Sequence, residues 1–225
     1  LLQAHRQASG ERLSFTAFLL YCIGRAVAQH PAVHAVRDWR GRLVRFRDVD
    51  IMTIVEIQTG GRPYPMPHVL RATNRRSLRQ LHDEIRRVQS TPQQRKHDPA
   101  RRWRYRLFAL LPGFVRRLFF RLITVRPLAR KRTAGTVAVT AIGMFGNGRG
   151  HGIAAATLYN LGFVVGGIVE QPALDADGQL VVREMLQLTA SFDHDIVDGA
   201  PATRFIQTLR GLVESGSGLD SVSAS

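Results

Sequence analysis

The stretch SFDHDIVDG, residues 191–199, guides the interpretation of the rest of the sequence. Apolar residues precede it from Leu180 onward, so we expect a strand that ends in three acids, a histidine and a glycine just before a helix. An imidazole at a strand end can act as a general base, with Asp198 four residues further on and Gly199 allowing a tight turn. The same pattern also fits an ordinary hydrogen-bonded turn. One histidine with scattered carboxylates lacks the paired ligands of a zinc site, so no metal is expected.

Three amphipathic helices are predicted from apolar residues at three- and four-residue spacing. The first follows Ser14, a good N-cap, and runs to Pro31. The second covers residues 77–88, and the last begins at about Ala200, with Pro201 in its first turn. Strands are expected at residues 49–57, 135–140, 162–169 and 180–192.

Two segments rich in glycine or proline interrupt these elements. Residues 39–42, Trp-Arg-Gly-Arg, predict a turn between two short strands. Gly60-Gly61, followed by prolines at alternate positions from Pro63 to Pro67, predicts a segment without regular structure.

Composition is lopsided in charge, with 32 Lys+Arg against 17 Asp+Glu and a net charge of +15. Residues 92–132 hold 13 of the basic residues and a single acid, Asp98, so the rest of the chain carries only +3. A single cysteine, Cys22, excludes a disulfide framework within the chain, and a cytoplasmic location is expected. No run of 18 apolar residues occurs. Because the chain begins at Leu1 rather than Met, we expect a natural N-terminal stretch to precede it.

The basic segment also carries aromatic residues, and its centre reads LFALLPGFVRRLFFRLI, residues 107–123. Pro112-Gly113 predicts a break between two short helices. Three interpretations stay open: a surface hairpin that packs its aromatics onto its own domain or a neighbouring subunit, contact of residues 101–125 with an anionic membrane surface, and nucleic-acid binding. Nucleic acid is the least favoured, because no helix-turn-helix, zinc-finger or RNA-binding signature accompanies the arginines.

Four stretches together resemble the 2-oxoacid dehydrogenase acyltransferase (dihydrolipoyl acyltransferase) family. They are SFDHDIVDGAPATRFIQTLRGLVE (191–214), SFTAFLLYCIGRAVAQHPAVHA (14–35), GTVAVTAIGMFG (135–146) and PHVLRATNRRSLRQLHDEI (67–85). In order and spacing the resemblance covers most of residues 1–91 and 133–215, and the basic insert at 92–132 falls outside it. It implies one catalytic domain over residues 1–225, of the chloramphenicol-acetyltransferase-like α/β (α+β) class: a mixed β-sheet flanked by helices, assembled as a homotrimer with active sites between subunits.

The resemblance also implies a site. The family histidine falls on His194, the expected general base on a thiol or hydroxyl that attacks a thioester carbonyl. The family's hydroxyl donor to the oxyanion falls on Thr140, and Asp198 would hold the site geometry. Coenzyme A or acyl-CoA would be the substrate, with an unknown acceptor, and other 2-oxoacid dehydrogenase components are possible partners. Neither Lys96 nor Lys131 lies in the acidic turn of a lipoyl attachment site.

The sequence departs from the family pattern at two places. Asp195 stands where the family usually has arginine, and a carboxylate close to the imidazole would favour its protonated form. Residues 146–168 lack the family's proline pattern, and His151 in that stretch is either a second polar group in the channel or an exposed loop residue. The alternative hypothesis is therefore a catalytically inactive trimeric scaffold that uses the basic insert to dock at a membrane, at its inner face, or on a protein partner.

Overall fold

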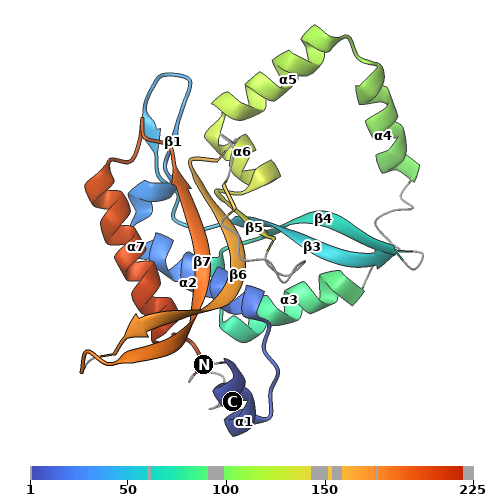
Figure 1. Cartoon of the computed structure of the whole chain (residues 1–225). Helices are drawn as coiled ribbons and strands as arrows, with labels where there is room; N and C mark the ends of the chain where they lie inside the picture. Colours follow the sequence, from blue (N-terminus) through green and yellow to red (C-terminus); the bar gives the residue numbers. More distant parts are fainter. Residues whose placement is uncertain are drawn as a thin grey trace.

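A five-stranded mixed sheet forms the centre of the molecule, in the order β4-β3-β5-β6-β7 (Figure 1). The computed structural model describes residues 2–59, 62–90, 99–142, 152–153, 159–175 and 177–219. The middle pairs β3–β5 and β5–β6 are parallel, and the outer pairs β3–β4 and β6–β7 are antiparallel. The strands are β3 (Ile51–Thr59), β4 (Arg62–Leu70), β5 (Val137–Ala141), β6 (Leu161–Leu174) and β7 (Leu180–Phe192). The predicted mixed α/β class is confirmed.

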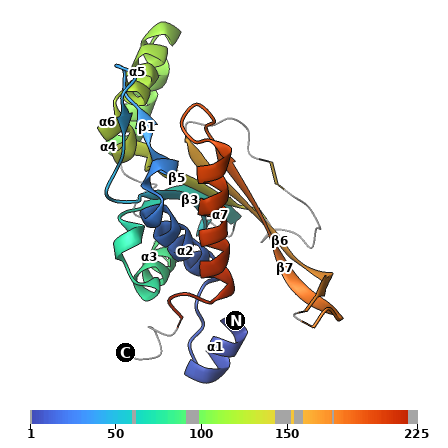
Figure 2. The same cartoon turned by 90° about the vertical axis from the view of Figure 1, so that its left-hand side faces the viewer.

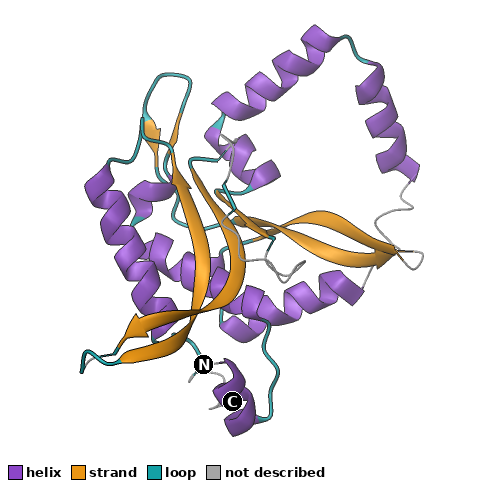
Figure 3. Ribbon diagram, viewed as in Figure 1, coloured by secondary structure: helices purple, strands orange, loops and turns teal. Residues whose placement is uncertain are grey.

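Three helices cover one face of this sheet: α2 (Phe15–Gln29), α3 (Leu78–Ser90) and α7 (Gly199–Glu214) (Figures 2 and 3). All three match the helices predicted from apolar spacing. They bury one continuous apolar core against β3, β5 and β6, which includes the fully buried Phe163 and Phe205. A short helix, α1 (Leu2–Ser9), precedes α2 and was not predicted.

Helix α2 begins as expected, because the Ser14 hydroxyl accepts the Ala17 N–H at 3.5 Å. Pro31 then opens a 3-10 turn, η1 (Pro31–His34), and a second 3-10 turn, η2 (Thr73–Arg75), crosses α2 at Gly24. A Cβ at Gly24 would come within 2.7 Å of the Thr73 hydroxyl, so only glycine permits this crossing. The predicted turn at 39–42 joins β1 (Val36–Arg37) to β2 (Leu43–Val44).

The proline-rich segment is a strand, which corrects the prediction of irregular structure. β4 pairs with β3 over nine residues, from Ile51 opposite Leu70 to Thr59 opposite Arg62. β4 is an edge strand of the sheet, and Pro63, Pro65 and Pro67 occupy alternate positions along it. Alternate nitrogens share one side of a strand, so these prolines remove donors only along the free outer edge. The same feature protects that edge against pairing with another strand.

The basic segment forms three helices, of which only the last packs closely on the body. The predicted break at Pro112-Gly113 is confirmed, since it separates α4 (Pro99–Leu110) from α5 (Gly113–Val125). Helix α6 (Pro127–Ala134) was not predicted. Arg71 donates to the carbonyls of Lys131 and Arg132 at 2.7 and 2.6 Å, and Lys131 pairs with Asp50 at 3.4 Å. In the described part of the chain, no helix has the length and apolar character needed to cross a membrane.

Candidate active site

His194 lies exposed on a tight turn between the end of β7 and the start of α7. The Asp193 carbonyl accepts the N–H groups of Ile196 and Val197, each at 3.0 Å, and the Asp193 carboxylate accepts the N–H of Asp195 at 3.1 Å. Val197 is buried beneath the turn. The backbone that carries His194 is therefore fixed while its imidazole faces outward.

A buried polar network supports this turn from behind. The Asn160 carbonyl accepts the Asp193 N–H at 2.9 Å, and the Asn160 side chain accepts from Arg130 at 3.1 Å and donates to the Ala35 carbonyl at 2.5 Å. Burial lowers the pKa of the Arg130 guanidinium, while the charges of Tyr159 and Asp193 act to raise it. Sequence reasoning missed this network, which links α6, the start of β6 and the His194 turn.

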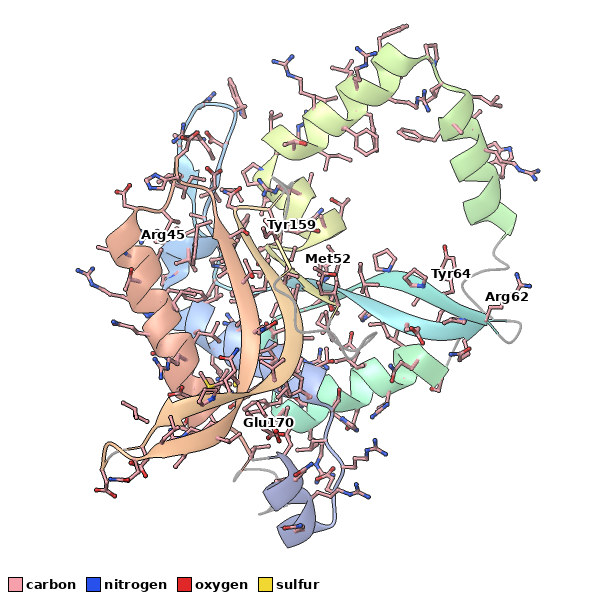
Figure 4. All side chains as sticks on the ribbon, in the orientation of Figure 1. Arg45, Met52, Arg62, Tyr64, Tyr159 and Glu170 are labelled. Carbon is pink, nitrogen blue, oxygen red and sulfur yellow. The ribbon has the colours of Figure 1, made fainter. Side chains whose placement is uncertain are left out.

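Tyr159 ties the same network to the end of α6 (Figure 4). Its hydroxyl donates to the Ala134 carbonyl at 2.7 Å, and burial raises its pKa. A second support comes from β1, where the Arg37 guanidinium donates to the Asp195 carbonyl at 3.0 Å. The position that departs from the family pattern is thus held by its backbone, and its carboxylate is exposed.

Asp198 is the N-cap residue of α7, but its carboxylate makes no capping hydrogen bond. It is exposed, as His194 is, and no hydrogen bond joins either side chain to another residue in the described ranges. Both side chains are therefore free to meet a substrate or a second subunit.

Thr140 lies on the sheet, well away from His194 of the same chain. It pairs with Val164 on β6, which pairs with Thr189 on β7, three residues before Phe192. With about 4.8 Å between strands and about 3.3 Å per residue, the Cα atoms of Thr140 and Phe192 are about 14 Å apart. His194 lies beyond Phe192, so one copy of the chain does not bring the two predicted groups together.

The face of the sheet that carries Thr140 is the one that α2, α3 and α7 leave uncovered. Val139 points into the core beneath the helices, so its neighbour Thr140 points the other way. Gly152 lies against this open face, where an added Cβ would overlap Val164 and Ile142. His151 lies outside the described residues.

On the helix side of the sheet, a cavity of about 210 Å³ lies between the start of α2 and strands β5 and β6. Its lining is almost entirely apolar and includes Leu19, Val139 and Ile168. Thr140 faces the opposite side, so we do not assign this cavity to the reaction.

Burial raises the pKa of the Cys22 thiol to about 12, which makes this side chain an ineffective nucleophile.

The segment around these residues matches a known class of catalytic domain. Residues 129–219 match the family described as 2-oxoacid dehydrogenases acyltransferase (catalytic domain), and this range contains Thr140, His194 and Asp198. The family resemblance predicted from the sequence is confirmed over residues 129–219. Arg130, Asn160 and Asp193, which support the turn, lie in the same range.

A curated relative shares this segment. The chain is 41% identical over 91 residues to the lipoamide acyltransferase component of the branched-chain alpha-keto acid dehydrogenase complex of Pseudomonas putida, covering 38% of this chain and 20% of the relative. This relative is an enzyme of the acyltransferase class. The chain spans about a fifth of the length of the curated relatives that it matches.

Solved structures agree with the fold over nearly the whole chain. The dihydrolipoamide acetyltransferase of Azotobacter vinelandii has a TM-score of 0.65 at 20% identity, covering 94% of this chain and 74% of that one. The cubic core of the pyruvate dehydrogenase multienzyme complex has a TM-score of 0.63 at 20% identity, with coverages of 93% and 72%. The fold expected from the family is confirmed.

Proposed function

We propose that this chain catalyses acyl transfer between thiols, with coenzyme A as one acyl carrier and His194 as the general base. The observation that carries the proposal is the buttressed turn at 193–197, which presents an exposed imidazole within the segment that matches the acyltransferase family. The name of the Pseudomonas relative suggests lipoamide as the second carrier.

The proposed reaction needs a base and an oxyanion donor. The His194 imidazole takes the proton of the attacking thiol, and the sulfur forms a new bond to the thioester carbonyl carbon. The resulting oxyanion accepts a hydrogen bond from the Thr140 hydroxyl. Collapse of the intermediate breaks the original carbon–sulfur bond, and the imidazolium returns its proton to the leaving thiolate.

Work on the Azotobacter structure addresses a serine, a histidine and an asparagine in catalysis, the last two being four residues apart. His194 and Asp198 have the same separation, and Thr140 offers a hydroxyl in place of serine. We propose that Asp198 orients the site through its carboxylate.

The separation of Thr140 from His194 leads us to propose that each site is shared by two copies. The exposed His194 of one copy would face the open sheet of the next, and a closed ring of three satisfies this head-to-tail contact. Exposed apolar residues on the projecting β6–β7 hairpin offer further contact surface: Ile168, Leu174, Leu180, Val182 and Met185. Association with other 2-oxoacid dehydrogenase components is part of the same proposal.

The lipoyl group would be a substrate brought from elsewhere. Lys131 is held by Asp50 and is only 18% exposed, which does not suit a swinging arm. Lys96 lies outside the described residues. We therefore propose that the thiol is delivered by a lipoyl group attached outside residues 1–225 or by free dihydrolipoamide.

The test is turnover of acetyl-CoA and longer acyl-CoAs with dihydrolipoamide, with S-acyl product measured by mass spectrometry. His194→Ala should lower the rate 10²- to 10⁴-fold, the range for loss of a general base. Thr140→Ala should lower it about 10²- to 10³-fold, whereas Thr189→Ala on the same sheet face is the matched control and should have little effect.

The same assay distinguishes an active acyltransferase from the scaffold alternative, which the family match does not favour. If a folded trimer binds coenzyme A but transfers no acyl group from any of these donors, the chain is a scaffold. If His194→Ala retains full turnover, the chain is an acyltransferase but His194 is not its general base.

A further inference from the structure

Helices α4 and α5 form an arm that stands away from the body (Figure 1). No described residue of α5 is buried, although nine of its 13 residues are apolar or glycine. This differs from α2, α3 and α7, whose apolar faces are covered by the sheet. The arm therefore exposes a large apolar surface that the fold of this chain does not use.

The exposed apolar residues follow one side of each helix. On α5 they are Phe114, Leu118 and Leu122, spaced by four and 72%, 55% and 42% exposed. On α4 the residues Trp103, Leu107 and Leu110 follow the helical repeat and are 63%, 49% and 81% exposed. We call these two sets of three residues the apolar stripes. Helical residues at such spacing share a face, so each helix presents a continuous ridge.

The contacts between aromatic rings within the arm do not bury the apolar stripes. Phe108 of α4 stacks edge-on with Phe119 and Phe120 of α5, at centroid distances of 5.1 and 5.8 Å. These rings hold the two helices at their junction, yet Phe119 and Phe120 remain 47% and 58% exposed. An intramolecular core is therefore not the role of the apolar stripes.

Charge distinguishes the partners that could cover such a surface. Residues 99–134 contain 11 Lys and Arg and no Asp or Glu. No ion pair joins Arg106, Arg116, Arg117 or Arg121 to a carboxylate in the described part of the chain. On α5, Arg117 directly precedes Leu118 and Arg121 directly precedes Leu122, so cationic groups border the ridge.

We propose that this arm, residues 99–125, binds the surface of an anionic phospholipid bilayer. Its helices would lie in the plane of the headgroups, with the apolar stripes in the acyl boundary and the arginines on lipid phosphates. Nucleic acid would match the charge but leave the Leu and Phe ridges in water. The cytoplasmic location expected from the sequence would place the arm at the inner face of the membrane.

The first experiment is flotation of the full chain with vesicles of phosphatidylcholine alone or with phosphatidylglycerol added. Binding should require the anionic lipid and should weaken as salt rises, because headgroup attraction is screened. Equal binding to both vesicles, or none to anionic vesicles at low salt, overturns the proposal. So does binding to duplex or single-stranded nucleic acid without vesicle binding.

Trp103 provides a direct report of insertion, since the chain has only two tryptophans. In the Trp39→Phe variant, Trp103 is the only indole, and its emission should shift to the blue with anionic vesicles and be quenched by brominated acyl chains. The matched control is Trp103→Phe, which leaves the exposed Trp39 of the β1–β2 hairpin and should show neither change. Identical responses from the two variants would contradict insertion through the arm.

Charge-matched variants localise the electrostatic part. Arg117→Gln with Arg121→Gln should lower the vesicle partition about fivefold per arginine, and so about 25-fold for the pair. Arg183→Gln with Arg204→Gln removes the same charge from β7 and α7 and should change it little. Equal losses in both pairs would mean a general charge effect. The parent protein could fail to bind vesicles while Phe114→Ser changes the oligomer mass measured by light scattering. That result would make the arm a contact between subunits instead.

Discussion

The turn that carries His194 and the α4–α5 arm are both exposed, but they are built in opposite ways. Behind His194, Arg130, Asn160 and Asp193 meet in a buried network with hydrogen bonds of 3.1 and 2.9 Å. On the arm, the described arginines lack carboxylate partners and Phe114 is 72% exposed. A general base needs a rigid backbone that fixes its position. An exposed amphipathic surface without intramolecular partners is instead expected where a protein binds a deformable surface such as a lipid bilayer.

This difference also separates stability from surface function. The body contains the continuous apolar core, so the free energy of unfolding should depend on it, while the arm should contribute little. Substitutions in the two regions should therefore affect different measurements.

Matched phenylalanine truncations give the largest predicted difference. Phe205→Ala removes a ring with no exposed surface that contacts Phe163, Phe192 and His30, and should lower the free energy of unfolding by about 3–5 kcal/mol. Phe114→Ala should change it by less than about 0.5 kcal/mol. Urea unfolding of both variants measures the difference, and comparable losses would show that the arm belongs to the cooperative core.

Acid should destabilise the body through His34. Burial of its ring lowers the pKa to about 4 from 6.5, so the folded state favours the neutral imidazole. The unfolded state binds the proton first as pH falls, so this contribution is present above about pH 6.5 and is lost between about pH 6.5 and 4. From pH 7 to 4.5 the loss should be about 2 kcal/mol.

His34→Leu should flatten that part of the pH profile in urea unfolding. Glu84 serves as the comparison, because hydrogen bonds from His68 and then Arg76 lower its pKa to about 2 from 4.5. Its stabilisation is present above about pH 4.5 and lost below, so Glu84→Gln should alter only the more acidic range. An unchanged slope in His34→Leu between pH 6.5 and 4.5 would refute the assignment.

The network behind the turn gives the smallest stability effect and a distinct catalytic one. Arg130→Met removes the hydrogen-bond donor to Oδ1 of the Asn160 side chain. This should lower the free energy of unfolding by about 1–2 kcal/mol. Displacement of the His194 turn should also lower turnover about 10- to 100-fold. Arg126→Met, an exposed neighbour without an ion pair in the described chain, should leave both measurements unchanged. Loss of stability with normal turnover would make Arg130 structural only.

The helices that bury the core could be predicted from the sequence because their signals are local. Ser14, the apolar spacing that follows it and Pro31 lie within one helix length and gave α2 correctly. The prolines of β4 were misleading, because their effect depends on whether the strand is central or at the edge. That position is set by pairing with β3 and cannot be deduced from residues 60–67 alone.

The candidate site was only partly predictable for the same reason. The pattern at the end of a strand pointed to His194 and Asp198, whereas Thr140 was found only through the family resemblance, and the structure leaves all three roles as predictions. Arg130 has no local signal, since its partners Asn160 and Asp193 lie 30 and 63 residues further along the chain. Only the fold brings these three together.

The central claim is that the site combines His194 of one copy with Thr140 of another. Its most direct test is to unfold and refold His194→Ala and Thr140→Ala together and assay acyl transfer. In a ring of random composition, about one quarter of the sites would regain both groups, so activity should return to about a quarter of the parent value. Separately refolded variants should stay inactive. Mixed trimers that are folded, verified by mass, and still inactive would contradict a shared site.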